Sequence, residues 1–123
     1  MKVLFLIMAG RDLPGRLSAA LAMAANSLRA NRYDDLKVIF FGPSEEYLGN
    51  LGGQDLENLR YLIDSGAVDS ACVSVAEKFG VKERLSALGL KLYPAGEAIE
   101  IRKHWIPGDI VLNDTQNIHP ELR

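Results

Sequence analysis

The chain has 123 residues, of which 48% are hydrophobic and 24% are charged, a composition typical of one globular domain with a single core. Fourteen basic and sixteen acidic residues give a formal net charge of −2, so the chain lacks the basic field that binds a nucleic-acid backbone. The single cysteine excludes an intrachain disulfide, and no apolar stretch is long enough to span a membrane. We therefore expect one domain over residues 1–123, a cytoplasmic location, and no nucleic-acid or membrane partner.

The first half of the chain alternates apolar runs of strand length with helical patterns. Val3–Met8 is a continuous apolar run, which indicates a strand covered on both faces. After the loop AGRDLPGR, leucines and alanines recur at helical spacing over Leu13–Leu28. Leu36–Phe41 repeats the first pattern and is followed by Gly-Pro, and Gln54–Ser65 carries its leucines on one side and stops at a glycine.

The segment around the only cysteine fits two structures. Apolar residues at positions i, i+4, i+7 and i+11 match a helix that would bury Cys72 in a core stripe. A strand over Ala67–Cys72, followed by a helix from about Ser74, instead restores the alternation of strand and helix. We favour the strand, although Asp69 and Ser70 are unusual residues for a central strand.

The last third of the chain completes the alternation with a brief strand in LKLYP, a short helix in AGEAIEIRKHW and a final strand in DIVLND. The whole pattern predicts an α/β fold, a three-layer sandwich with a mainly parallel five-stranded sheet of the flavodoxin or Rossmann type. Ligands of such sheets bind beyond the carboxyl ends of the strands, where the strand order reverses. With the order 2-1-3-4-5, that crevice lies between the first and third strands.

In this arrangement two loops face each other across the crevice. The first loop supplies three charged side chains, Arg11, Asp12 and Arg16, and the second begins at Cys72. A thiol placed just before a helix meets the positive end of the helix dipole and backbone N–H groups, which favour the thiolate. We expect those groups near Val73 and Ser74. The helix end alone is too weak to make thiolate the main form at neutral pH, so a nearby guanidinium such as Arg11 is needed.

The loop GRDLPGRL has a second interpretation that needs no ligand. Its glycines are spaced as in a phosphate-binding P-loop, but Arg16 replaces the lysine and no Ser or Thr follows. Asp12 as a helix cap and Pro14 near the helix start explain the loop structurally. For the arginines alone, we favour this structural interpretation.

The remaining polar residues near the expected strand ends have weaker claims. Four of them are interpreted as solvated residues or helix-start acids: Glu45, Glu46, Tyr93 and Glu97. His104 is expected at the C-terminal end of a helix, and His119 in the tail beyond the last strand. One cysteine and two separated histidines give no metal-ligand spacing, and the sequence calls for no cofactor.

Three stretches together resemble one known family. They are MKVLFLIMAGRDLPGRLSAALAMA, GAVDSACVSVAEKFGV and AGEAIEIRKHWIPGDIVLND. In these the chain is similar to the DsrE/DsrF-like family, which includes the TusD-like sulfur-relay proteins of tRNA thiolation and dissimilatory sulfur oxidation. The resemblance implies a sulfur carrier or sulfurtransferase in which Cys72 holds a persulfide and passes its sulfane sulfur to a partner thiol. It also implies homo- or hetero-oligomers and a protein that donates or accepts sulfur.

Val75 stands where some family members have a second cysteine, so an internal disulfide step is excluded, whereas a one-thiol relay needs only Cys72. Whether the chain is itself an enzyme stays open. The alternative is a non-enzymatic module of the same fold that binds a small anion or a protein, with Cys72 as a packed residue. A flavodoxin-like nucleotide binder is a third and weaker hypothesis, because the first loop lacks a hydroxyl-rich phosphate cradle.

Overall fold

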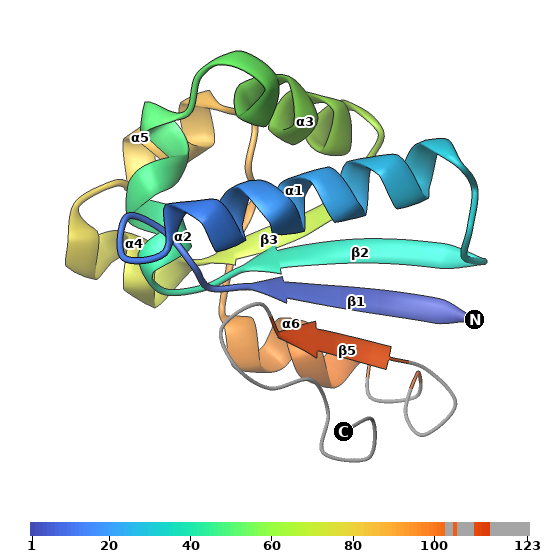
Figure 1. Cartoon of the computed structure of the whole chain (residues 1–123). Helices are drawn as coiled ribbons and strands as arrows, with labels where there is room; N and C mark the ends of the chain where they lie inside the picture. The colour runs from blue at the N-terminus through green and yellow to red at the C-terminus, as the bar shows by residue number, and fades with distance from the viewer. Residues whose placement is uncertain (103–104, 106–109, 114–123) are drawn as a thin grey trace.

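The structure is a computed structural model that describes residues 1–102, 105 and 110–113 (Figure 1). Strands and helices alternate along the chain. The strands are β1 (Lys2–Ile7), β2 (Asp35–Phe40), β3 (Val68–Cys72), β4 (Leu92–Tyr93) and β5 (Ile110–Asn113). The helices are α1 (Pro14–Arg29), α2 (Pro43–Tyr47), the 3-10 turn η1 (Leu48–Asn50), α3 (Gly53–Asp64), α4 (Val73–Phe79), α5 (Lys82–Ala87) and α6 (Ala95–Ile101).

All the strand pairs are parallel, and the order across the sheet is β4-β3-β2-β1-β5. The first four strands add one after another on the same side, and β5 pairs with the opposite edge of β1. The α/β class and the parallel sheet are thus confirmed. The order 2-1-3-4-5 is wrong, because β2 lies between β1 and β3.

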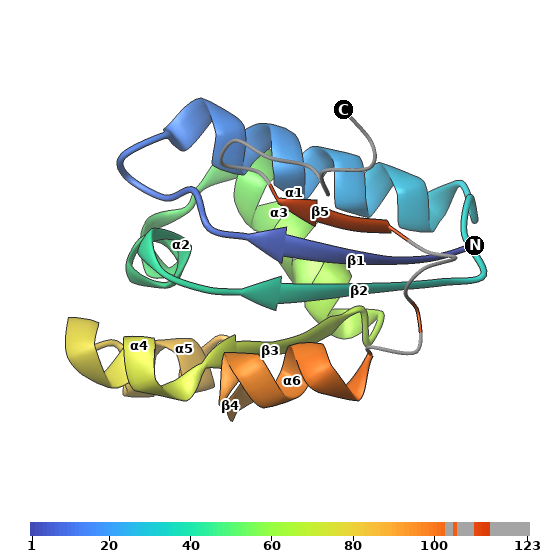
Figure 2. The ribbon, with the colours of Figure 1, turned by 90° about the horizontal axis from the view of Figure 1, so that it is seen from below.

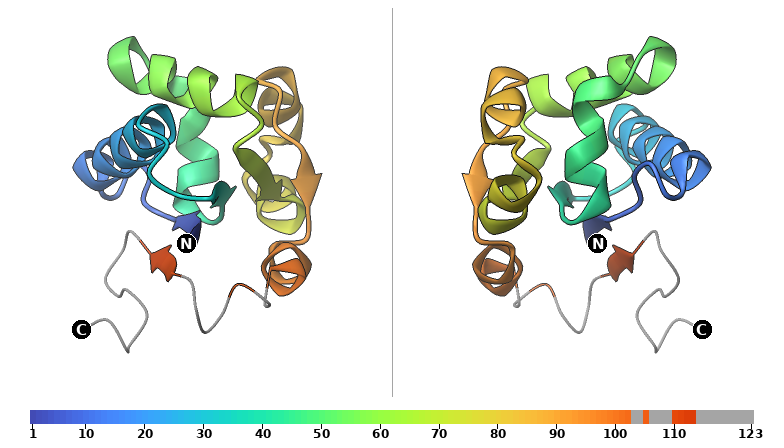
Figure 3. Two further views of the ribbon diagram at one scale, coloured as in Figure 1. Left: turned by 90° about the vertical axis from the view of Figure 1, so that its right-hand side faces the viewer. Right: turned by 90° about the vertical axis from the view of Figure 1, so that its left-hand side faces the viewer.

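Helices cover both faces of the sheet. Helices α1 and α3 lie together on one face and α6 lies on the other, as Figures 1 and 2 and the two end views of Figure 3 show. Strands β1 and β2 are mainly apolar because their alternate side chains enter different clusters. Phe5 and Ile7 join the larger cluster under α1 and α3, whereas Leu4 and Ile39 join a smaller one with Ala98 of α6.

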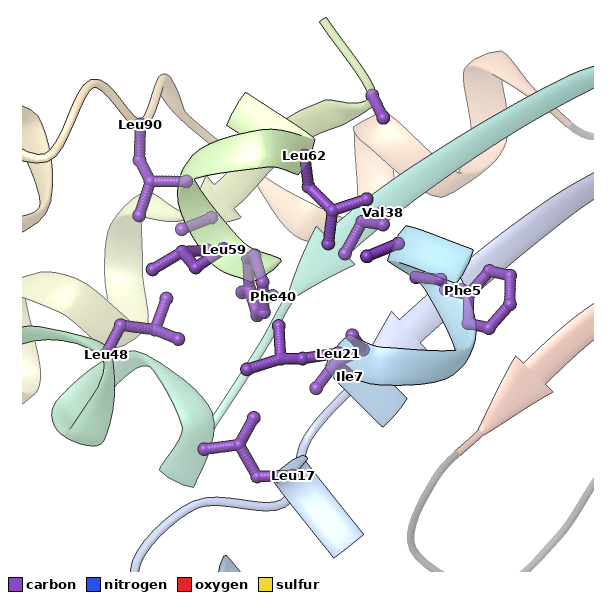
Figure 4. Close-up of a cluster of buried hydrophobic side chains, with 14 of the residues drawn as sticks. Phe5, Ile7, Leu17, Leu21, Val38, Phe40, Leu48, Leu59, Leu62 and Leu90 are labelled. Atoms are coloured by element: carbon purple, nitrogen blue, oxygen red, sulfur yellow. The ribbon is translucent and has the colours of Figure 1, made fainter. Parts of the chain in front are cut away.

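The larger cluster dominates the core (Figure 4). It brings together side chains from distant parts of the chain, among them Leu17, Leu21, Phe40, Leu59 and Leu62, all with at most 1% of their surface exposed. Burial of each such side chain contributes about 1.5–3 kcal/mol. Within the described part of the chain, no helix has the length and apolar character needed to cross a membrane.

The ambiguous segment around the cysteine is a strand followed by a helix, so the continuous helical stripe is wrong. The polar residues of β3 have partners that explain their presence in a strand. Asp69 forms an ion pair with Arg102, at the end of α6, with 2.8 Å between Oδ1 and Nη2. The hydroxyl of Ser70 donates to the other carboxylate oxygen of Asp69 at 2.9 Å. An ion pair therefore connects β3 to the end of α6.

Candidate functional site

Cys72 lies where the sequence predicts it, at the carboxyl end of β3 and directly before α4. Its surface is only 5% exposed, yet it belongs to neither of the two hydrophobic clusters. Val73 and Ser74 form the start of α4, with Val73 half-buried and Ser74 exposed. The Cys72 side chain makes no capping hydrogen bond to this helix. The thiol is thus buried at the carboxyl end of the sheet, outside the two main hydrophobic clusters.

The charged residues of the first loop lie elsewhere. The Arg11 guanidinium is exposed and reaches Glu46 of α2, with 3.9 Å between Nε and Oε1. Asp12 accepts a hydrogen bond from the backbone N–H of Gly10 at 2.9 Å, so it folds its own loop and does not cap α1. Arg16 is exposed in the first turn of α1, which begins at Pro14 as expected.

The predicted cleft between the loops after β1 and β3 is therefore wrong, and the physical reason is the strand order. Strand β2 separates the two loops, and α2, which follows β2, packs against α4. Among the described residues, no hydrogen bond or ion pair joins Arg11 or Asp12 to Cys72. The guanidinium that the sequence argument placed beside the thiol has Glu46 as its partner.

A carboxyl stands beside Cys72 in place of that guanidinium. Glu45, the third residue of α2, is completely buried, with 0% of its surface exposed. Its Oε2 accepts a hydrogen bond from the backbone N–H of Gly42 at 3.2 Å, and its Oε1 has no hydrogen-bond partner. Burial raises the pKa of Glu45 to about 7, while the backbone N–H groups of Gly42 and Cys72 act in the opposite direction. Of the two interpretations of Glu45, the helix-start acid is confirmed by its place in the first turn of α2, and the solvated residue is wrong.

The strand geometry sets the direction in which the backbone N–H of Cys72 points. The N–H of Ala71 donates to the carbonyl of Lys91 on the β4 side, at 2.9 Å. Successive residues of a strand direct their N–H groups to opposite neighbours, so the N–H of Cys72 points to the β2 side. There the last pair of the ladder is Phe40 with Ala71. Glu45 lies on this side, close enough for the N–H of Cys72 to act on its carboxyl.

Helix α2 is held in a fixed position, which directs Glu45 inward. The Ser44 hydroxyl donates to the carbonyl of Ile7 at 2.8 Å, and its backbone N–H donates to the carbonyl of Met8 at 2.9 Å. Gly10 allows this approach, because a Cβ at that position would lie 2.2 Å from the Pro43 carbonyl oxygen. The Glu45 carboxylate accepts the backbone N–H of Gly42, the residue before the helix, and glycine has no side chain to return such a bond.

Of the other predicted residues, Tyr93 is the ladder partner of Cys72 on β4. Tyr93 and Glu97 also line an open depression with Glu100 and Ile101. A hollow of about 140 Å³ lies at the opposite edge of the sheet, near the start of β2 and the ends of α1 and α3. His104 and His119 are outside the described residues. Within the described ranges, no group of three or more His, Cys, Asp or Glu side chains could hold a metal ion.

No family model and no curated protein matches the sequence. The fold has a known counterpart. BT1422 from Bacteroides thetaiotaomicron, a conserved protein of unknown function, is similar over 91% of this chain and 93% of its own, with a TM-score of 0.72. At 21% sequence identity the likeness shows the fold alone. The chemistry of the site has to be argued from this chain's own residues.

Proposed function

We propose that this protein is a sulfur carrier of the DsrE/DsrF-like type, in which Cys72 holds a persulfide and passes sulfane sulfur to a partner thiol. One observation carries the proposal. Cys72 is sheltered at the carboxyl edge of a parallel sheet, but it lies outside both hydrophobic clusters and next to a buried carboxyl.

The transfer needs one thiol and no oxidant. The Cys72 thiolate attacks the sulfane sulfur of a donor, which is a small or protein-bound persulfide. The sulfur–sulfur bond of the donor breaks as the new one forms on Cys72, and the donor leaves as a thiolate that takes up a proton. In the second step an acceptor thiolate attacks the outer sulfur, and Cys72 is released. Because Val75 stands three residues further on, no internal disulfide competes with either step.

The low exposure of Cys72 favours one alternative function. A thiol that is 5% exposed reacts slowly with a bulky donor unless the surrounding loops open. If they stay closed, Cys72 is a packed residue and the protein is a binding module for a small anion or a protein. Accessibility of the thiol therefore separates the two functions.

Intact mass spectrometry after treatment with inorganic polysulfide or thiosulfate tests the proposal. We expect the wild type to gain one sulfur, Cys72→Ser to gain none, and a reducing thiol to remove the adduct. The reduction step is needed because a sulfinic acid has almost the same added mass but does not reverse. Absence of a reversible adduct with every donor would favour the binding module.

A further inference from the structure

Glu45 is the only fully buried acid among the residues that the structure describes. Its position as the third residue of α2 explains one carboxylate oxygen, because Oε2 accepts the Gly42 N–H. It does not explain why Oε1 is also removed from water without a partner. A buried polar atom without a hydrogen-bond partner lowers the stability of the folded protein. Such an atom indicates either a binding partner that is absent from the resting state or a carboxyl that gains and loses a proton during function.

The neighbouring reactive group is Cys72. Its backbone N–H is directed to the β2 side of the sheet edge and interacts with the Glu45 carboxyl. Oε1 has no hydrogen bond to the resting thiol. A second sulfur on Cys72 would extend the side chain by one S–S bond of about 2 Å. Proton exchange requires only hydrogen-bond reach or one bridging water, and such contacts tighten when substrate is bound.

We propose that Glu45 is the acid–base partner of Cys72 in sulfur transfer, taking the proton of the thiol as the sulfur attacks and giving it to the departing donor thiolate. This role rests on the proposed sulfur-carrier function. Cys72 and Glu45 begin with one proton on the thiol and one negative charge on the carboxylate. After the attack the proton is on Glu45, the donor leaves as a thiolate, and the proton moves to that thiolate. The products are the Cys72 persulfide and the free donor thiol.

The same pair also stabilises the loaded form. A persulfide is a stronger acid than the thiol from which it forms, so loading moves the negative charge to the sulfur and a proton to Glu45. The neutral Glu45 carboxyl then donates its O–H to the charged sulfur, so that Oε1, which has no partner in the empty protein, gains a hydrogen bond. The pair thus carries one negative charge in both the empty and the loaded state, and the buried site never holds two.

No other charged side chain replaces Glu45 in this exchange. Around it, the titratable groups on neighbouring elements are those of α2, α4 and the loop after β1: Glu46, Tyr47, Glu77, Lys78, Arg11 and Asp12. Glu46 is paired with Arg11, and Glu77 with Lys82 of α5 at 4.0 Å. The pKa of Glu45 is governed by burial and by backbone N–H groups, and at about 7 it suits proton exchange at neutral pH.

Two reagents with different leaving groups separate the proton role from simple thiol reactivity. Glutathione persulfide releases a thiolate that needs a proton, whereas iodoacetamide releases iodide, which does not. Both rates are measured between pH 6 and 8.5 for the wild type, Glu45→Gln and the matched control Glu46→Gln. We expect Glu45→Gln to load sulfur roughly tenfold more slowly or worse and to lose less than that in alkylation, because alkylation needs the thiol proton removed but no proton delivered to the leaving group. Glu46→Gln should match the wild type in both reactions.

Equal loading rates in Glu45→Gln and the wild type would overturn the acid–base role while leaving the sulfur carrier intact. An equal fall of both reactions in Glu45→Gln would also overturn it, because loading would then show no extra loss from the missing proton delivery to the donor thiolate. A wild type that is alkylated at Cys72 but never loaded rejects the sulfur-carrier function itself, and the acid–base role with it.

A second measurement needs no variant and covers the case in which Glu45→Gln fails to fold. The Glu45 carboxyl carbon is followed by NMR at pH 7 in the wild type before and after persulfide loading. We expect its signal to move toward that of the protonated acid on loading and to return when the persulfide is reduced. A signal that does not move contradicts the proposal.

Discussion

At the scale of single residues, the carboxyl of Glu45 makes stability depend on pH in an unusual direction. Its folded pKa of about 7 lies above its usual value of 4.5, because burial disfavours the charge. Between these values the folded protein keeps a proton that the unfolded chain has lost. The stabilisation that comes from this retained proton is therefore fully present below pH 4.5 and is lost as the pH rises through 7. Its upper limit is about 3 kcal/mol of the free energy of unfolding.

Urea unfolding of the wild type, Glu45→Gln and Glu46→Gln at pH 5 and pH 8 measures this contribution. We expect the wild type to lose stability between the two pH values relative to Glu45→Gln, whose amide stays neutral throughout. Glu46 is partly exposed, and its replacement should leave the pH dependence of the wild type unchanged. A Glu45→Gln variant with the same pH dependence as the wild type would show that the buried carboxyl does not titrate in this range.

The residue scale is also where sequence reasoning succeeds and fails most clearly. The place of Cys72 follows from the alternation of strand and helix, and the structure has it at the end of β3. The burial of Glu45 does not follow from its local sequence, Gly-Pro-Ser-Glu-Glu, in which either acid reads as a solvated helix-start residue. What distinguishes Glu45 from Glu46 is the fixed orientation of α2, which depends on contacts of Ser44 with Ile7 and Met8.

At the scale of elements, the position of α2 depends on the absence of a side chain at Gly10. We expect Gly10→Ala to destabilise the fold by about 1–3 kcal/mol or more, because its Cβ would lie 2.2 Å from the Pro43 carbonyl oxygen and the backbone must shift. Gly15→Ala is the matched control. A Cβ there meets nothing within 4 Å, and alanine favours the helix that Gly15 occupies, so stability should be unchanged or slightly higher.

Thermal and urea unfolding of the two variants check this prediction, and the reaction of Cys72 with iodoacetamide reports on the site. If α2 moves in Gly10→Ala, Glu45 moves with it, and the reactivity of Cys72 should change together with stability. Equal stabilities for the two alanine variants would mean that the backbone after β1 can shift at little cost. That result would contradict the fixed position that we describe for α2.

Long elements were predictable because their side chains repeat a pattern over several turns or residues. The apolar runs of β1 and β2 and the helical spacing in α1 and α3 agree with the structure to within one or two residues. Helices α2 and α5 have five and six residues, which is too short for a periodic pattern, so the sequence analysis predicts neither as a separate helix. The missed helix α2 is the one that carries the buried carboxyl of the site.

At the scale of the whole molecule, strand order is what the sequence leaves open. Alternating strands and helices predict a parallel sheet, but each new strand can add to either edge of the sheet. Here β2, β3 and β4 add in succession on one side, and only β5 crosses to the other edge of β1. This order places α2 beside α4, so the partner of Cys72 is an acid from the β2 side and not an arginine from the β1 side.

The position of β5 makes β1 a strand with neighbours on both sides, and this has a testable consequence for stability. Val3–Leu6 of β1 pairs with Ile110–Asn113, and without β5 this apolar stretch becomes an exposed sheet edge. We expect a chain that ends at residue 109 to unfold at lower urea concentration than one that ends at residue 113. Each lost backbone hydrogen bond costs about 1 kcal/mol.

The shorter chain should also aggregate, as size-exclusion chromatography would detect. Both chains lack residues 114–123, so the comparison isolates β5, and equal stability would mean that β1 does not depend on this neighbour.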